Sequence, residues 1–329
     1  MTSKNSAAQA SGSFVGIACV LLASAIWGTT GTTATFAKGV GPLGIGAVAM
    51  GLGGLLLALT ASRSILRNSR RIAAQWPMLL IGSLSVAVYP LAFYSSMHLA
   101  GVAIGTVISI GSAPLAASLI ERIFDGQRLT TRWLLGAAAG LAGAVLLCLA
   151  EGAGHDGAGA ENATAVFYGI VLGLLSGLLY ALYAWVARRL MQAGIPPRAA
   201  MGSIFGVGGT LLLPVLAFTG APLLASWTNM AVGLYMALVP VLAAYVLFAY
   251  GLARVSATMA TTLSLLEPVI AAALAVVIVG ERLPAEGWVG MALIVGSLFI
   301  LTVPIPGSRR ARNAGPPSEP GFAAATPRT

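Results

Sequence analysis

One hydrophobic stretch, residues 255–283, is long enough to cross a lipid bilayer and carries a carboxylate near its middle. It closes with the charged sequence GERL, as expected where a membrane helix reaches the surface. A charge at mid-bilayer costs about 2.5–3.5 kcal/mol on insertion scales, so such a group normally faces a cavity or a partner. Glu267 is the only acid of this chain that cannot be placed near a membrane surface. We therefore expect the Glu267 side chain to face the interior of a membrane protein.

The rest of the composition agrees with a chain that crosses the membrane many times. Of its 329 residues, 58% are hydrophobic and only 8% are charged, whereas about 25% of residues in soluble domains are charged. The two cysteines, Cys19 and Cys148, lie inside apolar runs and form no disulfide framework or metal-ligand spacing. The sequence predicts an all-α polytopic membrane protein with ten transmembrane helices. Their approximate spans are 14–37, 43–62, 74–98, 101–124, 133–150, 165–187, 199–219, 228–252, 255–283 and 284–304.

The spans divide the chain into two halves of five helices. We expect an N-terminal tail at 1–13, a first repeat at 14–150, a periplasmic loop at 151–164, a second repeat at 165–304 and a disordered C-terminal tail at 305–329. The loop reads EGAGHDGAGAENAT, which is polar and rich in Gly. We do not expect its His155 and Asp156 to bind a metal, because the segment is flexible and exposed.

Basic residues predict how the chain is oriented. The net charge of +9 would suit a nucleic-acid-binding protein, but the distribution of the charges indicates membrane orientation instead. With the N-terminus inside, 16 of the 18 Lys and Arg residues fall on the cytoplasmic side, and only Lys38 and Arg282 fall outside. Cytoplasmic loops attract Lys and Arg. We therefore expect a bacterial inner-membrane protein with both termini in the cytoplasm and no nucleic-acid partner.

A weak internal repeat relates the two halves. Residues 94–129 align without a gap onto residues 248–283 at a constant offset of 154. Pro114 falls on Pro268, and the sequence GQRL falls on GERL. Because each half has an odd number of spans, the second half must enter the membrane in the opposite sense. Inverted repeats of this kind are common in secondary transporters, whose substrate sites lie near the midplane where the repeats meet.

These features resemble the ten-helix EamA-type members of the drug/metabolite transporter superfamily. The resemblance rests on Trp27-Gly28, on Leu266-Glu267-Pro268 and on the GERL sequence that follows, and it covers about residues 14–304. It implies alternating access and a central cavity lined by the first, third, fourth, sixth, eighth and ninth spans. The first half departs from the pattern, because Ala113 occupies the position that matches Glu267. Any role of the acid is thus carried by one half only.

Candidate substrate-binding or gating residues lie on these spans. Glu267 has three interpretations: it pairs with a cationic group of the substrate, it exchanges a proton, or it bonds a backbone group freed by a helix break. Hydroxyl groups either line the cavity or bond to their own helix, and aromatic side chains either line it, pack elsewhere or form an interfacial belt. Prolines inside spans are candidates for helix kinks. The binding candidates besides Glu267 are Trp27, Thr29, Thr33, Tyr89, Phe93, Tyr180, Tyr183, Tyr245, Phe248, Thr261 and Ser264, and the kink candidates are Pro90, Pro114, Pro240 and Pro268.

The sequence predicts a secondary transporter whose partners are a small-molecule substrate and the lipid bilayer. We expect it to export small metabolites, either amino acids or amphipathic compounds, driven by proton exchange or by the substrate gradient. No nucleotide-binding Gly-Lys loop is present, and no cofactor, metal or catalytic residues are expected. The alternative is a lipid-handling protein or a membrane enzyme that acts at the cavity. The absence of paired catalytic groups in the sequence argues against an enzyme.

Overall fold

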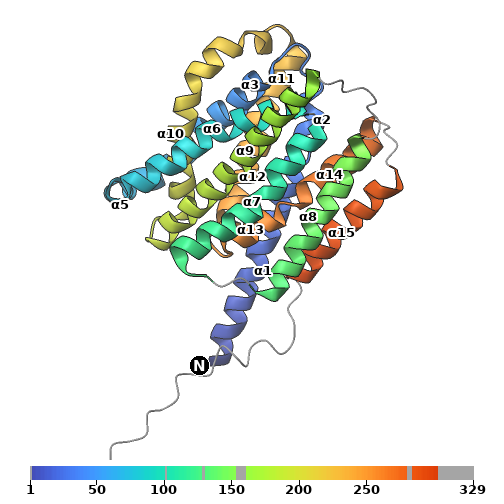
Figure 1. Cartoon of the computed structure of the whole chain (residues 1–329). Helices are drawn as coiled ribbons and strands as arrows, with labels where there is room; N and C mark the ends of the chain where they lie inside the picture. Colours follow the sequence, from blue (N-terminus) through green and yellow to red (C-terminus); the bar gives the residue numbers. More distant parts are fainter. Residues whose placement is uncertain (1, 101, 128–129, 153–160, 280–283, 303–329) are drawn as a thin grey trace, which may run out of the picture.

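A computed structural model describes residues 2–100, 102–127, 130–152, 161–279 and 284–302, and within these ranges the chain is helical with no β-strand (Figure 1). The predicted C-terminal tail, the GERL turn, His155 and Asp156 lie outside the described residues. The elements of the first half are α1 (Thr2–Trp27), α2 (Thr30–Ala34), α3 (Pro42–Ala47), η1 (Val48–Leu52), α4 (Gly53–Arg67), α5 (Ser69–Ala74), α6 (Trp76–Ala100), α7 (Val102–Asp125) and α8 (Thr131–Gly152). Those of the second half are α9 (Glu161–Gln192), α10 (Pro197–Thr219), η2 (Ala221–Leu224), α11 (Trp227–Met236), η3 (Ala237–Ala243), α12 (Ala244–Leu252), α13 (Ala257–Leu263), α14 (Leu266–Leu274), η4 (Ala275–Val279) and α15 (Ala285–Thr302).

The lengths and hydrophobicity of the helices confirm the predicted ten-helix fold. Within the described residues, eight helical stretches are long and apolar enough to cross a membrane. Two shorter apolar helices, Thr131–Leu146 and Ala285–Leu301, occupy the places of the fifth and tenth predicted spans. Helix α1 begins at Thr2, so the residues of the expected N-terminal tail continue the first helix instead of preceding it. The first span also ends as an α-helix at Trp27, and the hydroxyl-rich residues after it form the separate short helix α2.

The ninth span is broken immediately before Glu267. Proline has no N–H, so Pro268 cannot donate the helical bond that the Ser264 carbonyl would otherwise accept. The backbone N–H of Glu267 donates to that carbonyl instead, at 2.9 Å. Helix α13 therefore ends at Leu263, and Glu267 lies in the first turn of α14. The break gives the carboxylate an end-of-helix position in the middle of a span.

The other three kink candidates behave differently. Helices α6 and α7 run as single α-helices through Pro90 and Pro114. Pro240 lies in η3, a π-helical segment inside the eighth span. Pro114 matches Pro268 in the repeat, yet only the second copy is interrupted. The two halves thus share a sequence pattern but differ in structure at the position of the acid.

Helix contacts join the two halves in a symmetric pattern. Five pairs between the halves are α1 with α12, α4 with α10, α6 with α9, α7 with α13, and α8 with α15, and α7 also packs extensively on α9. Exchanging each span for its counterpart in the other half leaves these five pairs unchanged. Figure 1 shows one such pair, α8 and α15, side by side at one edge of the molecule. The pattern is that of two intertwined five-helix repeats, with the candidate cavity between them.

Small residues allow several of these pairs to pack closely. A Cβ atom added to Gly143 of α8 would lie 2.6 Å from the Gly290 carbonyl oxygen of α15. On α9, a Cβ at Gly177 would lie 2.6 Å from the Ser109 carbonyl oxygen of α7. Without a hydrophobic driving force between helices in lipid, such close van der Waals packing is a main source of stability.

Candidate functional site

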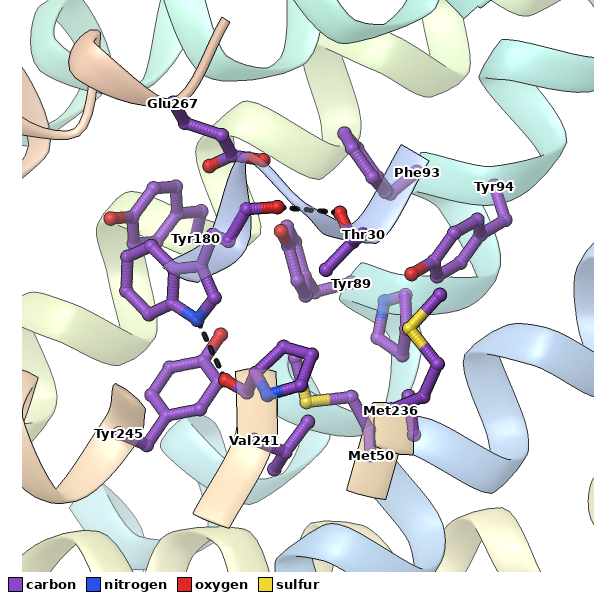
Figure 2. A pocket seen from close by; sticks show the side chains of 14 residues that line it. Thr30, Met50, Tyr89, Phe93, Tyr94, Tyr180, Met236, Val241, Tyr245 and Glu267 are labelled. Carbon is purple, nitrogen blue, oxygen red and sulfur yellow. Dashed lines mark hydrogen bonds between the residues drawn. The ribbon is translucent and has the colours of Figure 1, made fainter. Parts of the chain in front are cut away.

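A cavity lies between the two repeats and is almost entirely apolar and aromatic (Figure 2). Its walls come from α1, α2, η1, α6, α9, α11, η3, α12 and α14. The free volume between the side chains is about 40 Å³, which is room for roughly three water molecules. An amino-acid-sized ligand therefore requires these walls to move apart. The lining residues are Trp27, Thr30, Ala49, Met50, Tyr89, Pro90, Phe93, Tyr94, Tyr180, Met236, Pro240, Val241, Tyr245 and Glu267.

Trp27 is the central aromatic residue of the cavity wall. Its ring centroid lies 4.9 Å from that of Tyr245 and 6.3 Å from that of Tyr180. Its indole Nε1 donates a hydrogen bond of 2.8 Å to the Pro240 carbonyl oxygen. This bond fastens the end of α1 to the π-helical segment η3, so one side chain links two walls that belong to different halves.

Glu267 is the only charged side chain among the lining residues. It is 8% exposed, and its carboxylate is directed into the cavity (Figure 2). Within the described residues, no hydrogen bond or salt bridge reaches the carboxylate oxygens. The Ser264 carbonyl freed by the helix break already accepts the Glu267 backbone N–H. The carboxylate is thus held in an apolar surrounding with both oxygens free to meet a ligand or a proton.

Two tyrosine hydroxyls in the cavity wall are, like the Glu267 carboxylate, free to meet a ligand. Tyr89 and Tyr94 line the cavity, and neither phenol makes a hydrogen bond within the parts of the chain that the structure describes. By contrast, the Tyr180 hydroxyl lies 2.5 Å from Ser264 Oγ, and the Tyr245 hydroxyl lies 3.1 Å from the Tyr183 hydroxyl. The cavity therefore presents one carboxylate and two phenol groups that a ligand can reach. The hydroxyls of Tyr180 and Tyr245 are instead bonded within the protein.

A layer of aromatic side chains closes one end of the cavity. Tyr183, Phe205 and Phe248 are among the largest fully buried side chains of the protein. Tyr183 lies edge-on to Phe205, with 5.6 Å between ring centroids, and Phe248 packs on Trp27 at 5.3 Å. We call these three residues the aromatic floor. They lie on the side of the cavity toward the end of the bundle at which α9 finishes and α13 begins.

The structure separates the sequence candidates into three groups. Six of the predicted binding residues line the cavity, as do Pro90 and Pro240: Trp27, Tyr89, Phe93, Tyr180, Tyr245 and Glu267. Tyr183 and Phe248 belong to the aromatic floor. The remaining hydroxyls bond to nearby carbonyls of the chain: Thr29 to Ile26, Thr33 to Thr29, Thr261 to Ala257, and Ser264 to Ala260. Thr29 also lies 2.7 Å from the Tyr235 hydroxyl of α11, and Ser264 also bonds Tyr180. Thr30, which was not a candidate, lines the cavity beside them.

Sequence reasoning also missed part of the wall on the second and eighth spans. Ala49 and Met50 lie in the π-helical segment η1, and Met236 and Val241 lie at and within η3. These are small or apolar residues with no distinctive chemistry, so no sequence signal singled them out. Tyr94 had one signal, because it aligns with Phe248 in the repeat. π-Helical segments occur often at functional sites, and here two of them form the wall that faces α6.

Within the described residues, no three His, Cys, Asp or Glu side chains come together in a group that could hold a metal ion. The donor chemistry of the cavity is a single carboxylate with phenol groups, which suits an organic ligand.

Comparison with known proteins agrees with this geometry. The EamA-like transporter family model matches residues 14–149 and 167–303. An uncharacterized transporter of Bacillus subtilis, YwfM, is 33% identical over 286 residues, which cover 86% of this chain and 92% of the relative. A probable terminal-alkyne amino-acid exporter of Streptantibioticus cattleyicolor is 27% identical over 304 residues, covering 88% and 97% of the two chains.

A crystal structure of similar fold supports the architecture. Its TM-score is 0.68 at 22% sequence identity, with 88% of this chain and 96% of the other chain covered. The two family matches correspond to the two halves of five helices, and the cavity lies between them. The chain is a multi-pass membrane protein that belongs to the EamA-like transporter family.

Proposed function

We propose that this protein exports small metabolites that carry an amino group or are amphipathic, by alternating access through the cavity between its two repeats. In this proposal Glu267 is the group on which transport depends. Its carboxylate pairs with a cationic group of the substrate or takes up a proton during the cycle. The protein acts as a transporter and not as an enzyme.

The observation that carries the proposal is the unpaired carboxylate of Glu267. A buried charge that lacks a partner is strongly unfavourable, so buried carboxylates are normally paired or hydrogen-bonded. Among the described residues, no Lys, Arg or His lines the cavity to neutralise it. A structural role would require the carboxylate to bond a backbone group freed by the helix break, and the contacts around Ser264 give no support for one. An amine-bearing substrate or a proton supplies the missing partner.

The rest of the cavity suits an organic cation with an apolar body. Aromatic rings attract ammonium groups through their faces, and six of the lining residues are Trp, Tyr or Phe: Trp27, Tyr89, Phe93, Tyr94, Tyr180 and Tyr245. The free hydroxyls of Tyr89 and Tyr94 add hydrogen-bonding capacity on the side of the cavity formed by α6. The S. cattleyicolor relative named as an amino-acid exporter adds support for a metabolite with an amino group.

The proposed orientation rests on charge. We infer a bacterial inner-membrane location with both termini in the cytoplasm. Arg63, Arg67 and Arg198 line a surface groove where α4 ends and α10 begins, at the end of the bundle that this orientation places in the cytoplasm. Basic residues gather on that side of membrane proteins.

A transport assay with Glu267→Gln tests the role of the acid. A thermal-shift screen of the purified protein against metabolites first identifies a ligand, and uptake of that ligand into proteoliposomes then measures flux. We expect Glu267→Gln to lose at least about tenfold of the flux, the loss expected when an interaction with a charged group is removed, while remaining folded in the membrane. Glu286→Gln makes the same chemical change at an exposed carboxylate in the first turn of α15 and serves as the matched control. Full flux in Glu267→Gln would contradict the proposal.

A further inference from the structure

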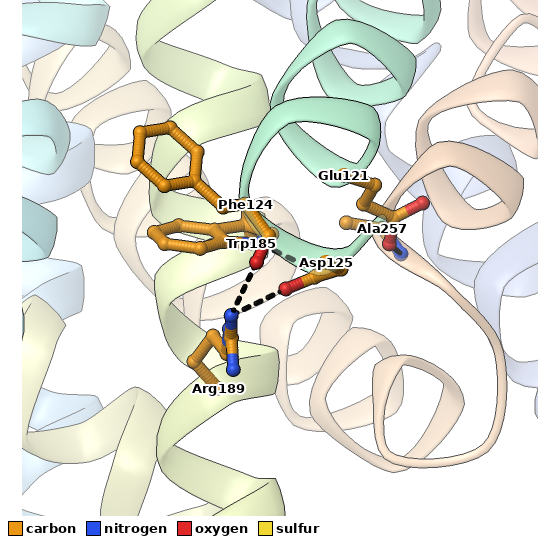
Figure 3. Close-up of polar contacts among 6 residues, drawn as sticks. All are labelled: Glu121, Phe124, Asp125, Trp185, Arg189 and Ala257. Atoms are coloured by element: carbon orange, nitrogen blue, oxygen red, sulfur yellow. Dashed lines mark hydrogen bonds and ion pairs between the residues drawn. The ribbon is translucent and has the colours of Figure 1, made fainter. Parts of the chain in front are cut away.

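Glu121, near the end of α7, is a second buried carboxylate and is not among the lining residues of the cavity. It is only 2% exposed. Its Oε1 accepts a hydrogen bond of 2.8 Å from the Ala257 backbone N–H. Its Oε2 accepts bonds from the Thr258 backbone N–H at 3.3 Å and from the Thr258 hydroxyl at 2.6 Å. Figure 3 shows Glu121 reaching from α7 toward Ala257, where α13 begins. Unlike the Glu267 carboxylate, the Glu121 carboxylate accepts hydrogen bonds from the protein at both of its oxygens.

Glu121 completes the N-terminal cap of α13. The first four N–H groups of a helix have no partner within the helix. Ser256, the N-cap residue, satisfies one of them, because its Oγ accepts from the Met259 N–H. The Glu121 carboxylate satisfies two more, those of Ala257 and Thr258. The cap of one half is thus finished by a side chain from the other half, and a negative charge at this end of a helix is favourable.

Further contacts at the same end also join the two halves. Asp125 forms an ion pair with Arg189 of α9 at 2.6 Å, and it accepts a hydrogen bond of 3.0 Å from Trp185 Nε1 (Figure 3). Arg189 also donates to the Phe124 carbonyl oxygen at 3.0 Å. Helix α7 lies in the first family match, whereas α9 and α13 lie in the second. Separation of the halves at this end must break all of these bonds.

Helix α13 connects this cluster to the cavity. It has seven residues, and beyond it the chain passes through Ser264, which bonds Tyr180, to Glu267. Along α9, Tyr183 of the aromatic floor lies between Tyr180 of the cavity wall and Trp185 of the cluster. A short, rigid helix is therefore held at one end by Glu121 and reaches the cavity carboxylate at the other.

We propose that Glu121 is the latch of the transport path: it holds the N-terminus of α13, positions the helix break before Glu267, and releases α13 when the path opens at this end. The proposal rests on the transporter assignment and does not depend on what Glu267 binds. When the halves separate, water replaces the three hydrogen bonds at both the carboxylate and the helix end. The latch therefore sets the balance between the closed and open states of this end, although Glu121 is not itself a lining residue of the cavity.

Cysteine accessibility tests the latch without any knowledge of the substrate. Cys19→Ala and Cys148→Ala remove the native thiols, and a reporter cysteine is added as Ala260→Cys, which is fully buried on α13. A second reporter, Thr30→Cys, lies in the cavity wall on the other side of the aromatic floor. A membrane-impermeant maleimide is then applied to vesicles from either side. We expect Glu121→Gln to raise labelling of Ala260→Cys about tenfold from the Glu121 side, the shift that follows from loss of one charge-assisted hydrogen bond.

The two reporters distinguish a latch from general loosening. For a latch, labelling of Thr30→Cys from the opposite side falls as labelling of Ala260→Cys rises, because the two ends open alternately. Thr258→Val removes one of the three bonds with little change of shape, and we expect a smaller shift in the same direction. Unchanged labelling of Ala260→Cys in both variants, or a rise at both reporters together, would overturn the proposal. Glu286→Gln again controls for the chemical change.

Discussion

Gly28 packs directly against the backbone of Glu267. A Cβ atom added to Gly28 would lie 2.8 Å from the Glu267 carbonyl oxygen and 2.6 Å from Cβ of Ile270. The sequence pairs that carry the family resemblance, Trp27-Gly28 and Leu266-Glu267-Pro268, are therefore in contact across the two halves. Trp27 then forms the cavity wall beside the carboxylate. The absence of a side chain at Gly28 allows the end of α1 to reach the broken helix.

We expect Gly28→Ala to push α1 away from α14. Overpacking of this kind typically costs about 1–3 kcal/mol, so the midpoint of thermal unfolding in detergent should fall and transport should weaken. Gly31→Ala is the matched control, since in the part of the chain that the structure describes no neighbouring atom lies within 4 Å of a Cβ added there. Equal midpoints for the two variants would show that the contact between Gly28 and Glu267 does not constrain the packing.

Removal of the Trp27 hydrogen bond should destabilise the link between α1 and η3. Trp27→Phe keeps an aromatic ring but leaves the Pro240 carbonyl oxygen without its 2.8 Å donor. An unsatisfied buried acceptor costs about 1–3 kcal/mol, which thermal unfolding of the purified protein measures. Trp227→Phe, at a position that is 83% exposed, should have little effect. If both variants unfold at the wild-type temperature, the Trp27 bond is not a significant link.

The helices could be predicted because hydropathy depends on composition, but the interruption of the ninth span could not. Pro114 and Pro268 give the same local signal at matched positions of the repeat. The structure keeps α7 continuous through Pro114, while the chain breaks before Pro268. A proline removes one hydrogen bond in both cases. Tertiary packing decides whether the helix stays continuous without that hydrogen bond or is interrupted. The packing partners of Ser264 are distant in sequence.

Only part of the cavity wall could be predicted, again because tertiary packing decides the outcome. The spans are apolar all round, so no polar face fixes how each helix is rotated about its axis. The sequence identified aromatic residues on helices that line the cavity. It did not distinguish Tyr89, which lines the cavity, from Tyr183, which belongs to the aromatic floor. The π-helical segments η1 and η3 add to this difficulty, because a π-turn changes which residues face inward. Met50 and Met236 lie in the wall as a result.

Reporter fusions should place the two ends of the bundle on opposite sides of the membrane. The predicted topology places 16 of the 18 basic residues on one side, and by the positive-inside rule a fusion in the 151–164 loop should be external. Fusions at the C-terminus and at Gln127, between α7 and α8, should be internal and act as controls. Alkaline phosphatase and green fluorescent protein activities report the two sides. An internal 151–164 loop would contradict the proposed orientation.

The hydrogen bond between Tyr180 and Ser264 should couple α9 to the broken helix. Ser264 Oγ lies 2.5 Å from the Tyr180 hydroxyl and also donates to the Ala260 carbonyl, so Tyr180 is the donor of the pair. We expect Tyr180→Phe and Ser264→Ala each to lower the unfolding free energy by about 0.5–1.5 kcal/mol. In the double variant the loss should be smaller than the sum, because the two residues share one bond.

A double-mutant cycle in detergent measures this coupling. Tyr250→Phe controls for loss of a tyrosine hydroxyl, because Tyr250 is 40% exposed and its hydroxyl makes no hydrogen bond within the described residues. Transport by Tyr180→Phe should also fall, since the bond holds the end of α13 one turn before Glu267. Strictly additive losses would mean that the two hydroxyls act independently, and that another contact holds the helix break in place.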